Sequence, residues 1–275
     1  MTSSVQRIEA RLQALGIEAL PKNGGVLQSA AVWFTDSGQY QTLKIGESTP
    51  RSPTDDFLLA FNRSRADAIV TTGQILRDEP ALCFDVAGNL GRDLGDWRKD
   101  ALGRSQAPWI VVLTRGGQLP WGHPVVASDR TLILTGQEAS VPEPPDSSKI
   151  IRRAAPGLID TIAFLRTEMG CETMLIEAGP STSSVLYQTD DNVDELMLSV
   201  YREDRLPPGV RGRAFPSAAT LVSAGLHEVS SRSVQEASGL WSFHRWLRSG
   251  PGGSEVEDET PRATVGGGAI LSVLA

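Results

Sequence analysis

The chain has 275 residues, a formal net charge of −7 and 40% hydrophobic residues, which is the composition of a soluble globular protein. This length accommodates one large domain or two small ones. The acidic balance argues against broad nucleic-acid binding, which requires a basic face. The cysteines and histidines form no CxxC, HExxH or paired-histidine spacing, so we expect neither a metal site nor a disulfide scaffold.

Other classes of protein are disfavoured by motifs that the sequence lacks. It contains no run of roughly 18 apolar residues, as a transmembrane helix requires, and its first residues lack the apolar core of a signal peptide. We therefore expect no membrane partner and a cytoplasmic location. The GxSxG and GxxxxGK[ST] motifs are also missing, which makes serine-hydrolase and P-loop chemistry improbable.

Apolar periodicity and turn residues predict the elements of the first half of the chain. They are an amphipathic helix at 5–15, a strand at 30–34 in a hairpin with a strand at 40–45, a helix after Ser52, a buried strand at 66–71 and a helical turn around 75–76. Ser52 is expected to cap its helix, with Pro53 at the first helical position. Residues 85–108, rich in Gly, Asp and Arg, are expected to form a long surface excursion.

The second half alternates strands with helices and then ends in strands alone. The expected elements are strands at 109–114 and 131–135, a loop at 136–148, a helix at 158–165, a strand at 173–177, a short helix from 181 to 186, and strands at 193–201, 226–233 and 240–247. This order predicts an α/β sandwich with a mostly parallel sheet and an antiparallel C-terminal edge. Residues 1–249 are expected to form one domain, with a helix within 1–20, and the Gly-rich, acidic 250–275 a flexible tail.

Two strand-to-helix turns are candidates for holding phosphate groups. One contains residues 71–74, and the other contains residues 177–180 followed by four hydroxyl side chains at 181–184. Glycine allows close approach of the backbone to a ligand, and free N–H groups at a helix start favour anions. In open α/β sheets, ligands bind outside the carboxyl ends of the strands, where both turns are expected. The alternative is that both are ordinary connections, because neither contains GxGxxG.

Glu177 is unusual because it stands at the end of a predicted strand. A carboxylate in that position is partly desolvated unless another group pairs with it. Either Glu177 has a function there, or it is capped or faces solvent.

Several segments together resemble one protein family. They are GES at 46–48, ADAIVTTGQILRDEPAL at 66–82, PWIVVLTRGGQLP at 108–120 and LIEAGPSTSSVLYQTDDNVDELMLSVY at 175–201. In this order and spacing they are similar to the reductase domain of bacterial riboflavin biosynthesis, the C-terminal domain of bifunctional deaminase-reductases. The resemblance covers about residues 26–248 and implies a dihydrofolate reductase-like three-layer sandwich.

The resemblance also implies an activity. Members of this family use NADPH to reduce the ribose carbonyl of 5-amino-6-(5-phosphoribosylamino)uracil by hydride transfer. The nicotinamide carries such chemistry, while the protein supplies positioning and electrostatics, which suits a chain with few histidines and cysteines. The deaminase half of bifunctional relatives needs a His/Cys zinc motif that this sequence lacks. A homodimer acting on a small molecule is expected.

Roles for individual residues follow from the same resemblance. The implied cofactor-binding residues are Gly73, Gln74, Asp78, Thr114, Arg115, Gly179, Pro180, Ser181 and Thr182. The implied substrate-binding residues are Ser48, Arg63, Leu82 and Glu177, with Glu177 also the catalytic candidate. Arg115 would pair with a 2′-phosphate and Arg63 with the substrate phosphate, a role that suits the planar guanidinium. A solvated surface side chain is the alternative for both arginines.

The sequence departs from the family pattern at three positions. No Lys stands near Ala31 or Val32 in the first strand, Gln74 replaces a Thr, and Asp85 occupies the position of an Arg. A carboxylate at that last position inverts the local charge and would repel a phosphorylated substrate. Three functions therefore stay open: a reductase of the riboflavin type, a related reductase with another pterin-like or carbonyl substrate, and a non-catalytic nucleotide-binding protein.

Overall fold

The computed structural model describes residues 2–17, 24–35, 37–116, 119–140, 149–154, 156–189 and 192–249. Its strands are β1 Gly25–Phe34, β2 Tyr40–Leu43, β3 Ala68–Thr72, β4 Trp109–Leu113, β5 Thr131–Gly136, β6 Lys149–Arg153, β7 Thr173–Ile176, β8 Glu195–Tyr201, β9 Arg211–Phe215, β10 Leu226–Glu236 and β11 Gly239–Arg248. Its helices are α1 Ser4–Ala14, α2 Pro53–Arg65, α3 Gly73–Asp78, α4 Gly88–Leu102, α5 Leu158–Thr167, α6 Pro180–Ser183, the 3-10 helix η1 Ser184–Tyr187 and α7 Ala218–Ser223.

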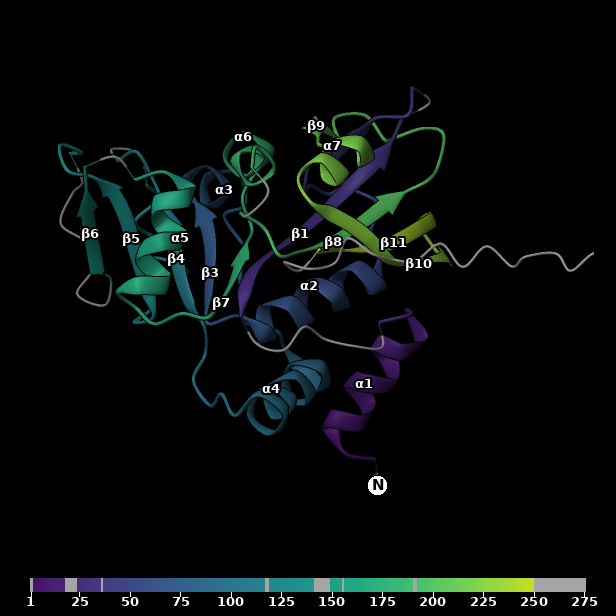
Figure 1. Ribbon diagram of the computed structural model, residues 1–275, viewed down its shortest axis with the longest axis horizontal. Coiled ribbons are helices and arrows are strands. Elements are labelled where there is room, and N and C mark those ends of the chain that lie inside the picture. The colour runs from purple at the N-terminus through teal and green to yellow at the C-terminus, as the bar shows by residue number, and fades with distance from the viewer. Residues whose placement is uncertain are drawn as a thin grey trace, which may run out of the picture.

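One sheet runs through the described part of the molecule in the order β10-β11-β8-β1-β7-β3-β4-β5-β6, with β2 paired to β1 and β9 paired to β2 (Figure 1). The run from β8 to β6 is parallel. The β2, β9, β10 and β11 strands pair antiparallel to their neighbours. Continuous burial along β3 and β8 is typical of parallel strands that are covered on both faces. The expected mostly parallel sheet with an antiparallel C-terminal edge is confirmed.

Helices cover both faces of the sheet, so the molecule has three layers (Figure 1). On β7, Met174 and Ile176 belong to one apolar cluster and Leu175 to another, as the two-residue period of a strand requires. The first cluster includes α5, η1 and α7. A further cluster joins α1, α2 and α4 to the opposite face of β1, β8 and β11. Two apolar layers therefore hold the helices on the sheet.

The expectation that residues 85–108 form a surface excursion is wrong, because they contain the helix α4. Leu90, Leu94 and Trp97 lie at helical spacing, and the last two are buried. The Trp97 ring lies 5.0 Å from that of Phe61 on α2. Glycines and charges dilute this stripe in the sequence. Gly91 is nevertheless required, since a Cβ there would lie 1.7 Å from the carbonyl oxygen of Val86.

Smaller differences from expectation concern where one strand begins and three short elements that the sequence pattern did not predict. The β1 strand begins at Gly25 rather than at residue 30, and the sequence pattern predicted neither β6, β9 nor α7. The β9 strand, RGRAF, is mostly exposed and forms through its pairing with β2. Parts of the predicted loop at 136–148 and of the turn at 35–38 lie outside the described residues, as does the predicted tail at 250–275.

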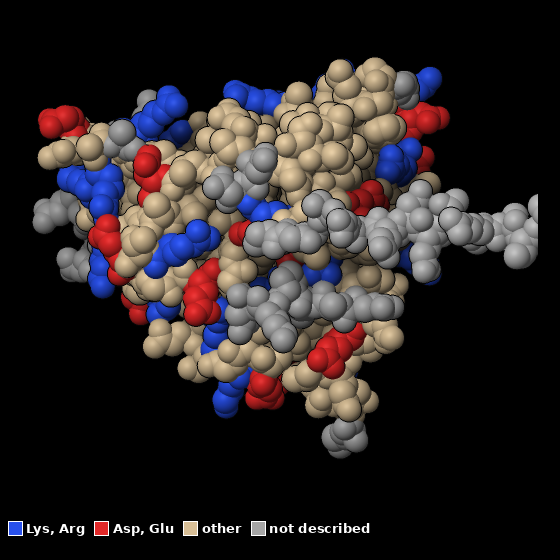
Figure 2. All heavy atoms as spheres, in the orientation of Figure 1, with Lys and Arg blue, Asp and Glu red and all other residues tan. Residues whose placement is uncertain are grey.

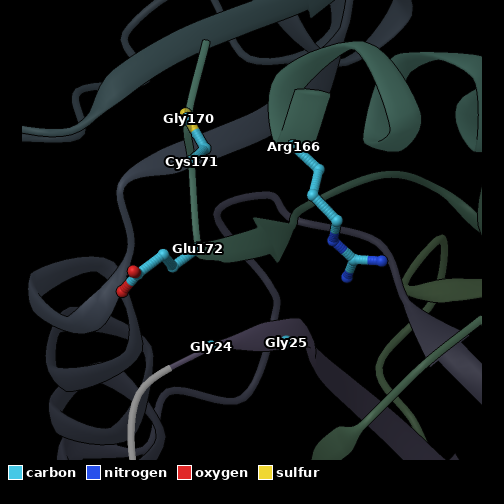
Figure 3. Close-up of a pocket in the computed structure, with 6 residues that line it drawn as sticks. All are labelled: Gly24, Gly25, Arg166, Gly170, Cys171 and Glu172. Carbon is cyan, nitrogen blue, oxygen red and sulfur yellow. The ribbon is translucent and has the colours of Figure 1, made fainter. Parts of the chain in front are cut away.

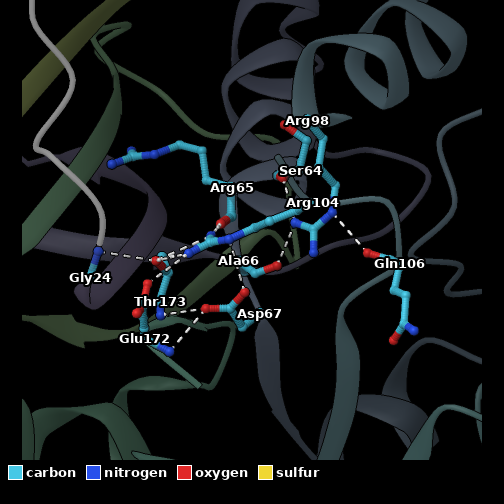
Figure 4. Close-up of polar contacts among 10 residues, drawn as sticks. All are labelled: Gly24, Ser64, Arg65, Ala66, Asp67, Arg98, Arg104, Gln106, Glu172 and Thr173. Atoms are coloured by element: carbon cyan, nitrogen blue, oxygen red, sulfur yellow. Dashed lines mark hydrogen bonds and ion pairs between the residues drawn. The ribbon is translucent and has the colours of Figure 1, made fainter. Parts of the chain in front are cut away.

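Helix α2 is fixed at both ends. Ser52 accepts a hydrogen bond from the Asp55 amide at 2.9 Å, and Pro53 is the first helical residue, as expected. At its C-terminus, Arg98 donates to the carbonyl groups of Ser64 and Ala66 (Figure 4). Cations at a helix C-terminus satisfy its free carbonyls and complement its dipole. These contacts cap the first turn of α2 and tie its C-terminus to α4.

Candidate functional site

The two turns that the sequence singled out and the segment at 114–115 that the resemblance added lie beside one another. Strands β7, β3 and β4 are consecutive in the sheet and parallel, with Val70 opposite Ile176 and Thr72 opposite Leu113. The Glu177 amide donates to the Val70 carbonyl at 2.9 Å, which continues this register beyond β7. The residues that follow the three strands therefore meet at the carboxyl edge of the sheet, where α/β proteins bind ligands.

Gly73 and Thr114 are in close contact at this edge. Thr72 caps α3 by accepting a hydrogen bond from the Ile75 amide. A Cβ on Gly73 would lie 3.1 Å from the Thr114 hydroxyl and 3.3 Å from a methyl group of Leu119. A side chain at this position would therefore require Thr114 and Leu119 to shift by a few tenths of an ångström. This packing gives Gly73 and Thr114 a structural role, and Arg115 beside them is exposed.

Gln74 and Asp78 form a polar pair on the exposed side of α3. The Gln74 amide donates to the Asp78 carboxylate at 2.7 Å, and its oxygen accepts from Arg77 at 2.6 Å. Gln74 therefore lies on the surface in the first turn of α3, and Asp78 lies one turn farther along, at the last residue of the helix.

The turn at residues 179–182 has open space beside it. Gly179 precedes α6 with extended backbone angles, and its N-cap position makes no side-chain hydrogen bond. A Cβ built on Gly179 meets nothing within 4 Å. Pro180 is the first residue of α6, and Ser181 is exposed while Thr182 is half-buried. The four predicted phosphate-binding residues are thus accessible from solvent.

Arg63 and Glu177 form a bidentate ion pair. Arg63 Nε donates to Glu177 Oε1 at 2.7 Å, and a terminal nitrogen donates to Oε2 at 2.6 Å. Each side chain is 13% exposed. The remaining terminal nitrogen of Arg63 donates to the Cys83 carbonyl at 3.2 Å, and the guanidinium lies 4.7 Å from the centre of the Phe84 ring. The structure therefore brings these two candidates together, and neither is a solvated surface group.

Charge is concentrated around this pair. Desolvation alone lowers the pKa of Arg63, but the charge of Glu177 and its hydrogen bonds raise the pKa overall. The Glu79 carboxyl has a raised pKa because of desolvation and because of the negative charge of Glu177. Thr71 stands beside Glu177 in the register, and its hydroxyl is buried with no hydrogen-bond partner in the described part of the chain.

The two other substrate candidates differ in position. Leu82 lies in the turn after α3, where its amide donates to the Glu79 carbonyl, and its side chain packs on the apolar cluster below. Ser48 is exposed in the segment after β2. No hydrogen bond or ion pair within the described ranges links Ser48 to the other candidates. Leu82 thus lies beside the other candidates at the carboxyl edge of the sheet. The position of Ser48 does not support a substrate-binding role.

Sequence reasoning placed Thr71 in a candidate turn but missed three residues of this site: Glu79, Cys83 and Phe84. The nearest available signal was the run RDEPAL, in which Glu79 directly follows the candidate Asp78. Among the described residues, no cluster of three His, Cys, Asp or Glu side chains has the arrangement of a metal site.

A surface pocket of about 510 Å³ lies at the other edge of the sheet (Figure 3). It is lined by Gly24, Gly25, Arg166, Gly170, Cys171 and Glu172. These residues precede or begin β1 and β7, whereas ligands of α/β sheets bind at the carboxyl ends. A network beside it joins Arg104 to Asp67, whose carboxylate accepts from the Glu172 and Thr173 amides (Figure 4). These contacts link the segment after α4 to the amino ends of β3 and β7.

Several solved structures that share this fold are reductases or reductase-like proteins. RibD of Acinetobacter baumannii superposes with a TM-score of 0.57 at 19% identity, over 86% of this chain and 62% of its own. A pyrimidine reductase-like protein from Corynebacterium diphtheriae gives 0.57 at 19% identity, over 90% of this chain and 98% of its own. A Thermotoga maritima diaminohydroxyphosphoribosylaminopyrimidine deaminase/5-amino-6-(5-phosphoribosylamino)uracil reductase gives 0.53 at 15% identity, over 82% and 57%.

These similarities confirm the dihydrofolate reductase-like fold that the sequence resemblance implied. No model of a protein family and no curated protein matches the sequence. The chain spans less than two thirds of the Acinetobacter and Thermotoga proteins. None of the described helices is both long and apolar enough to cross a bilayer. On the face shown in Figure 2, acidic and basic side chains are interspersed.

Proposed function

We propose that this chain is an NADPH-dependent reductase that transfers a hydride to a carbonyl or imine carbon of a small molecule. The observation that carries the proposal is the meeting of three candidate segments at the carboxyl ends of β7, β3 and β4. Its support is the shared fold with reductases, at low sequence identity.

The residues at this edge fit the chemistry of NADPH. The open turn at 179–182 offers hydroxyls and backbone amides to phosphate oxygens, without a side chain in the way at Gly179. Gln74 and Asp78 offer polar contacts on the surface of α3. The exposed guanidinium of Arg115 is suited to a 2′-phosphate. When bound, NADPH would supply the hydride, and the protein would supply position and electrostatics.

The Arg63–Glu177 pair is the proposed substrate-facing group. Both Glu177 oxygens accept hydrogen bonds from Arg63, so the carboxylate is fixed in orientation and negatively charged. A fixed carboxylate orients hydrogen-bond donors of a substrate relative to the hydride donor. Glu177 therefore acts on the substrate rather than on the cofactor in this proposal.

NADPH binding is tested by thermal unfolding of the full chain. A ligand that binds only the folded state at 100 times its dissociation constant stabilises that state by about 2.7 kcal/mol. For a chain of this size we expect a Tm rise of about 5 °C or more. Millimolar NADPH without effect on Tm would refute the reductase. A rise in Tm with no turnover of any carbonyl substrate would instead support the non-catalytic nucleotide-binding alternative.

Two substitutions separate cofactor binding from turnover. Gly179→Val is expected to abolish the NADPH-dependent Tm rise by filling the open turn, while leaving the fold intact because its φ is −62° and a Cβ there meets nothing within 4 Å. Glu177→Gln is expected to keep the Tm rise and to lower kcat. Equal loss of both properties in both variants would make Glu177 a structural residue. NADH binding as tightly as NADPH would contradict the role of Arg115.

The homodimer stays a prediction of the resemblance. Sedimentation equilibrium of the full chain at micromolar concentration measures it directly, and a purely monomeric species would contradict it.

A further inference from the structure

The cation that would meet a substrate phosphate is already occupied. Arg63 gives Nε and one terminal nitrogen to Glu177 and the other terminal nitrogen to the Cys83 carbonyl. Its planar face lies over the Phe84 ring. A bidentate guanidinium–carboxylate pair uses the same fork of donors that would bind a phosphate. Three of its five N–H groups are thus used, so a phosphate on Arg63 must either displace Glu177 or bind the remaining N–H groups directly beside the Glu177 carboxylate.

Both arrangements are unfavourable, because the phosphate would either lie beside the negative charge of Glu177 or replace Glu177 on Arg63. The Glu177 side chain is 13% exposed, so a displaced carboxylate would lose its cation without gaining full hydration. The Glu79 carboxylate acts on the same pair, and two negative charges would then face each other and the incoming phosphate. Asp85, exposed two residues after Cys83, adds a further negative charge on the approach.

The other nearby cations do not offset these charges. Arg51 is exposed, and its charge acts on Glu79. Arg77 is exposed on α3 and donates to Gln74. Because solvent screens exposed charges, these two contribute less to holding a phosphate beside Glu177 than the nearly buried Arg63 would.

We propose that the substrate is an uncharged carbonyl compound with amino or hydroxyl donors and without a phosphate ester. This inference rests on the proposed reductase function and specifies its substrate class. Glu177, held by Arg63, accepts from donor groups of the substrate, and the carboxylates around it repel a phosphorylated analogue. The pair thus selects against the phosphate instead of binding it.

The first experiment measures binding of inorganic phosphate and does not depend on turnover. Tm is compared in sodium phosphate and in sodium chloride at equal ionic strength, with NADPH saturating so that cofactor phosphate sites are filled. The wild type is expected to show no phosphate-specific shift. Glu177→Gln is expected to gain one, because its Arg63 guanidinium is released from a carboxylate.

Two results of this experiment would overturn the proposal. One is a phosphate-specific shift in the wild type that Arg63→Lys removes, since Arg63 would then bind phosphate despite Glu177. The other is no gain in Glu177→Gln, since the pair would then not be what excludes phosphate. If NADPH itself leaves Tm unchanged, the reductase function fails, and the phosphate comparison on unliganded protein still reports on Arg63.

The second experiment compares turnover of 5-amino-6-(5-phosphoribosylamino)uracil and of its dephosphorylated form by NADPH oxidation. The dephosphorylated compound is expected to have a kcat/KM higher by about tenfold or more. Asp85→Arg is expected to move this preference toward the phosphorylated compound, and Asp85→Asn, its matched neutral control, to move it less. An equal or higher kcat/KM for the phosphorylated compound in the wild type would overturn the proposal.

Discussion

At the scale of single residues, two candidates that the sequence identified separately became one group. Arg63 and Glu177 are 114 residues apart in the chain and join in one ion pair. Glu177 was recognisable because a carboxylate at a strand end needs a partner. Its partner was not recognisable, because which α2 side chain faces the end of β7 depends on how the helix packs on the sheet.

The two cysteines show how burial controls the reactivity of a side chain. Cys83 is exposed beside the site, whereas Cys171 is buried, and desolvation raises the pKa of the Cys171 thiol to about 11. Since only the thiolate reacts, we expect iodoacetamide near pH 8 to alkylate Cys83 about 100-fold faster than Cys171 in the native protein. Peptide mass spectrometry measures both rates.

Cys83→Ser is the control for this labelling and should remove the fast phase. Denaturant should make Cys171 as reactive as Cys83. Comparable labelling of the two thiols in the native protein would contradict the burial of Cys171.

At the scale of elements, α2 is the helix on which the site depends. Polar groups hold its first turn: Ser52 caps the Asp55 amide, and the Glu236 carboxylate accepts from the Thr54 amide at 3.2 Å. Farther along, Asn62 donates to Ser29 of β1 at 2.8 Å. The sequence predicted where α2 begins, but not these partners on β1 and β10. By holding α2 on these strands, the contacts place Arg63 where it meets Glu177.

Asp55 makes the seating of α2 sensitive to pH. Desolvation raises the pKa of this partly buried carboxyl to about 6, and nearby acidic groups add to the rise. The folded protein therefore holds this proton more tightly than the unfolded chain, so the contribution of Asp55 to stability decreases as pH rises from about 4 to about 6. Asp55→Asn is expected to match the wild type near pH 4 and to be more stable at pH 7 by about 1 to 3 kcal/mol.

Urea unfolding at several pH values measures this difference. Asp129→Asn, at an exposed position outside α2, is the control and should change the free energy of unfolding little across the range. The prediction would be contradicted if the difference in free energy of unfolding between the wild type and Asp55→Asn became smaller as pH rises. The pKa of Asp55 would then be lowered by folding instead of raised.

At the scale of the whole molecule, a buried ion triad joins α2, β8 and β11. Glu195 of β8 accepts from Arg65 at 2.7 Å and from Arg245 at 2.8 Å, and its side chain is 1% exposed. Desolvation alone raises the pKa of Glu195, but the charges of the two arginines, with their hydrogen bonds, lower it overall. The triad ties the antiparallel edge of the sheet to the helix that carries Arg63.

Removing the centre of this triad should destabilise the whole fold. Glu195→Ala leaves two guanidinium groups buried without their anion, which costs about 3 to 5 kcal/mol. Glu168→Ala is the control, because its pair with Arg153 is 54% exposed on the Glu side and such pairs contribute about 1 kcal/mol or less. The midpoint of urea unfolding compares them, and similar losses in the two variants would show that Glu195 is not a stability centre.

Local patterns determined much of the fold. Apolar runs such as AIVTT and ELMLSVY specify strands that are buried on both faces, and Ser52-Pro53 specifies a helix start, because these signals depend only on neighbouring residues. The pattern of α4 was obscured by its glycines, and Gly91 is explained only by the close carbonyl of Val86. The β9 strand likewise needs β2 beside it to form.

By itself, the sequence thus determined the fold class, most of the elements and the two ligand-binding turns as candidates. Only the tertiary structure decided that three segments meet at one edge, that Gly73 is tight while Gly179 is open, and that Arg63 is held by Glu177. The physical reason is that patterns along the chain report the local backbone and the side that faces the core. Pairing of charges, close approach and desolvation depend on residues that only folding brings together.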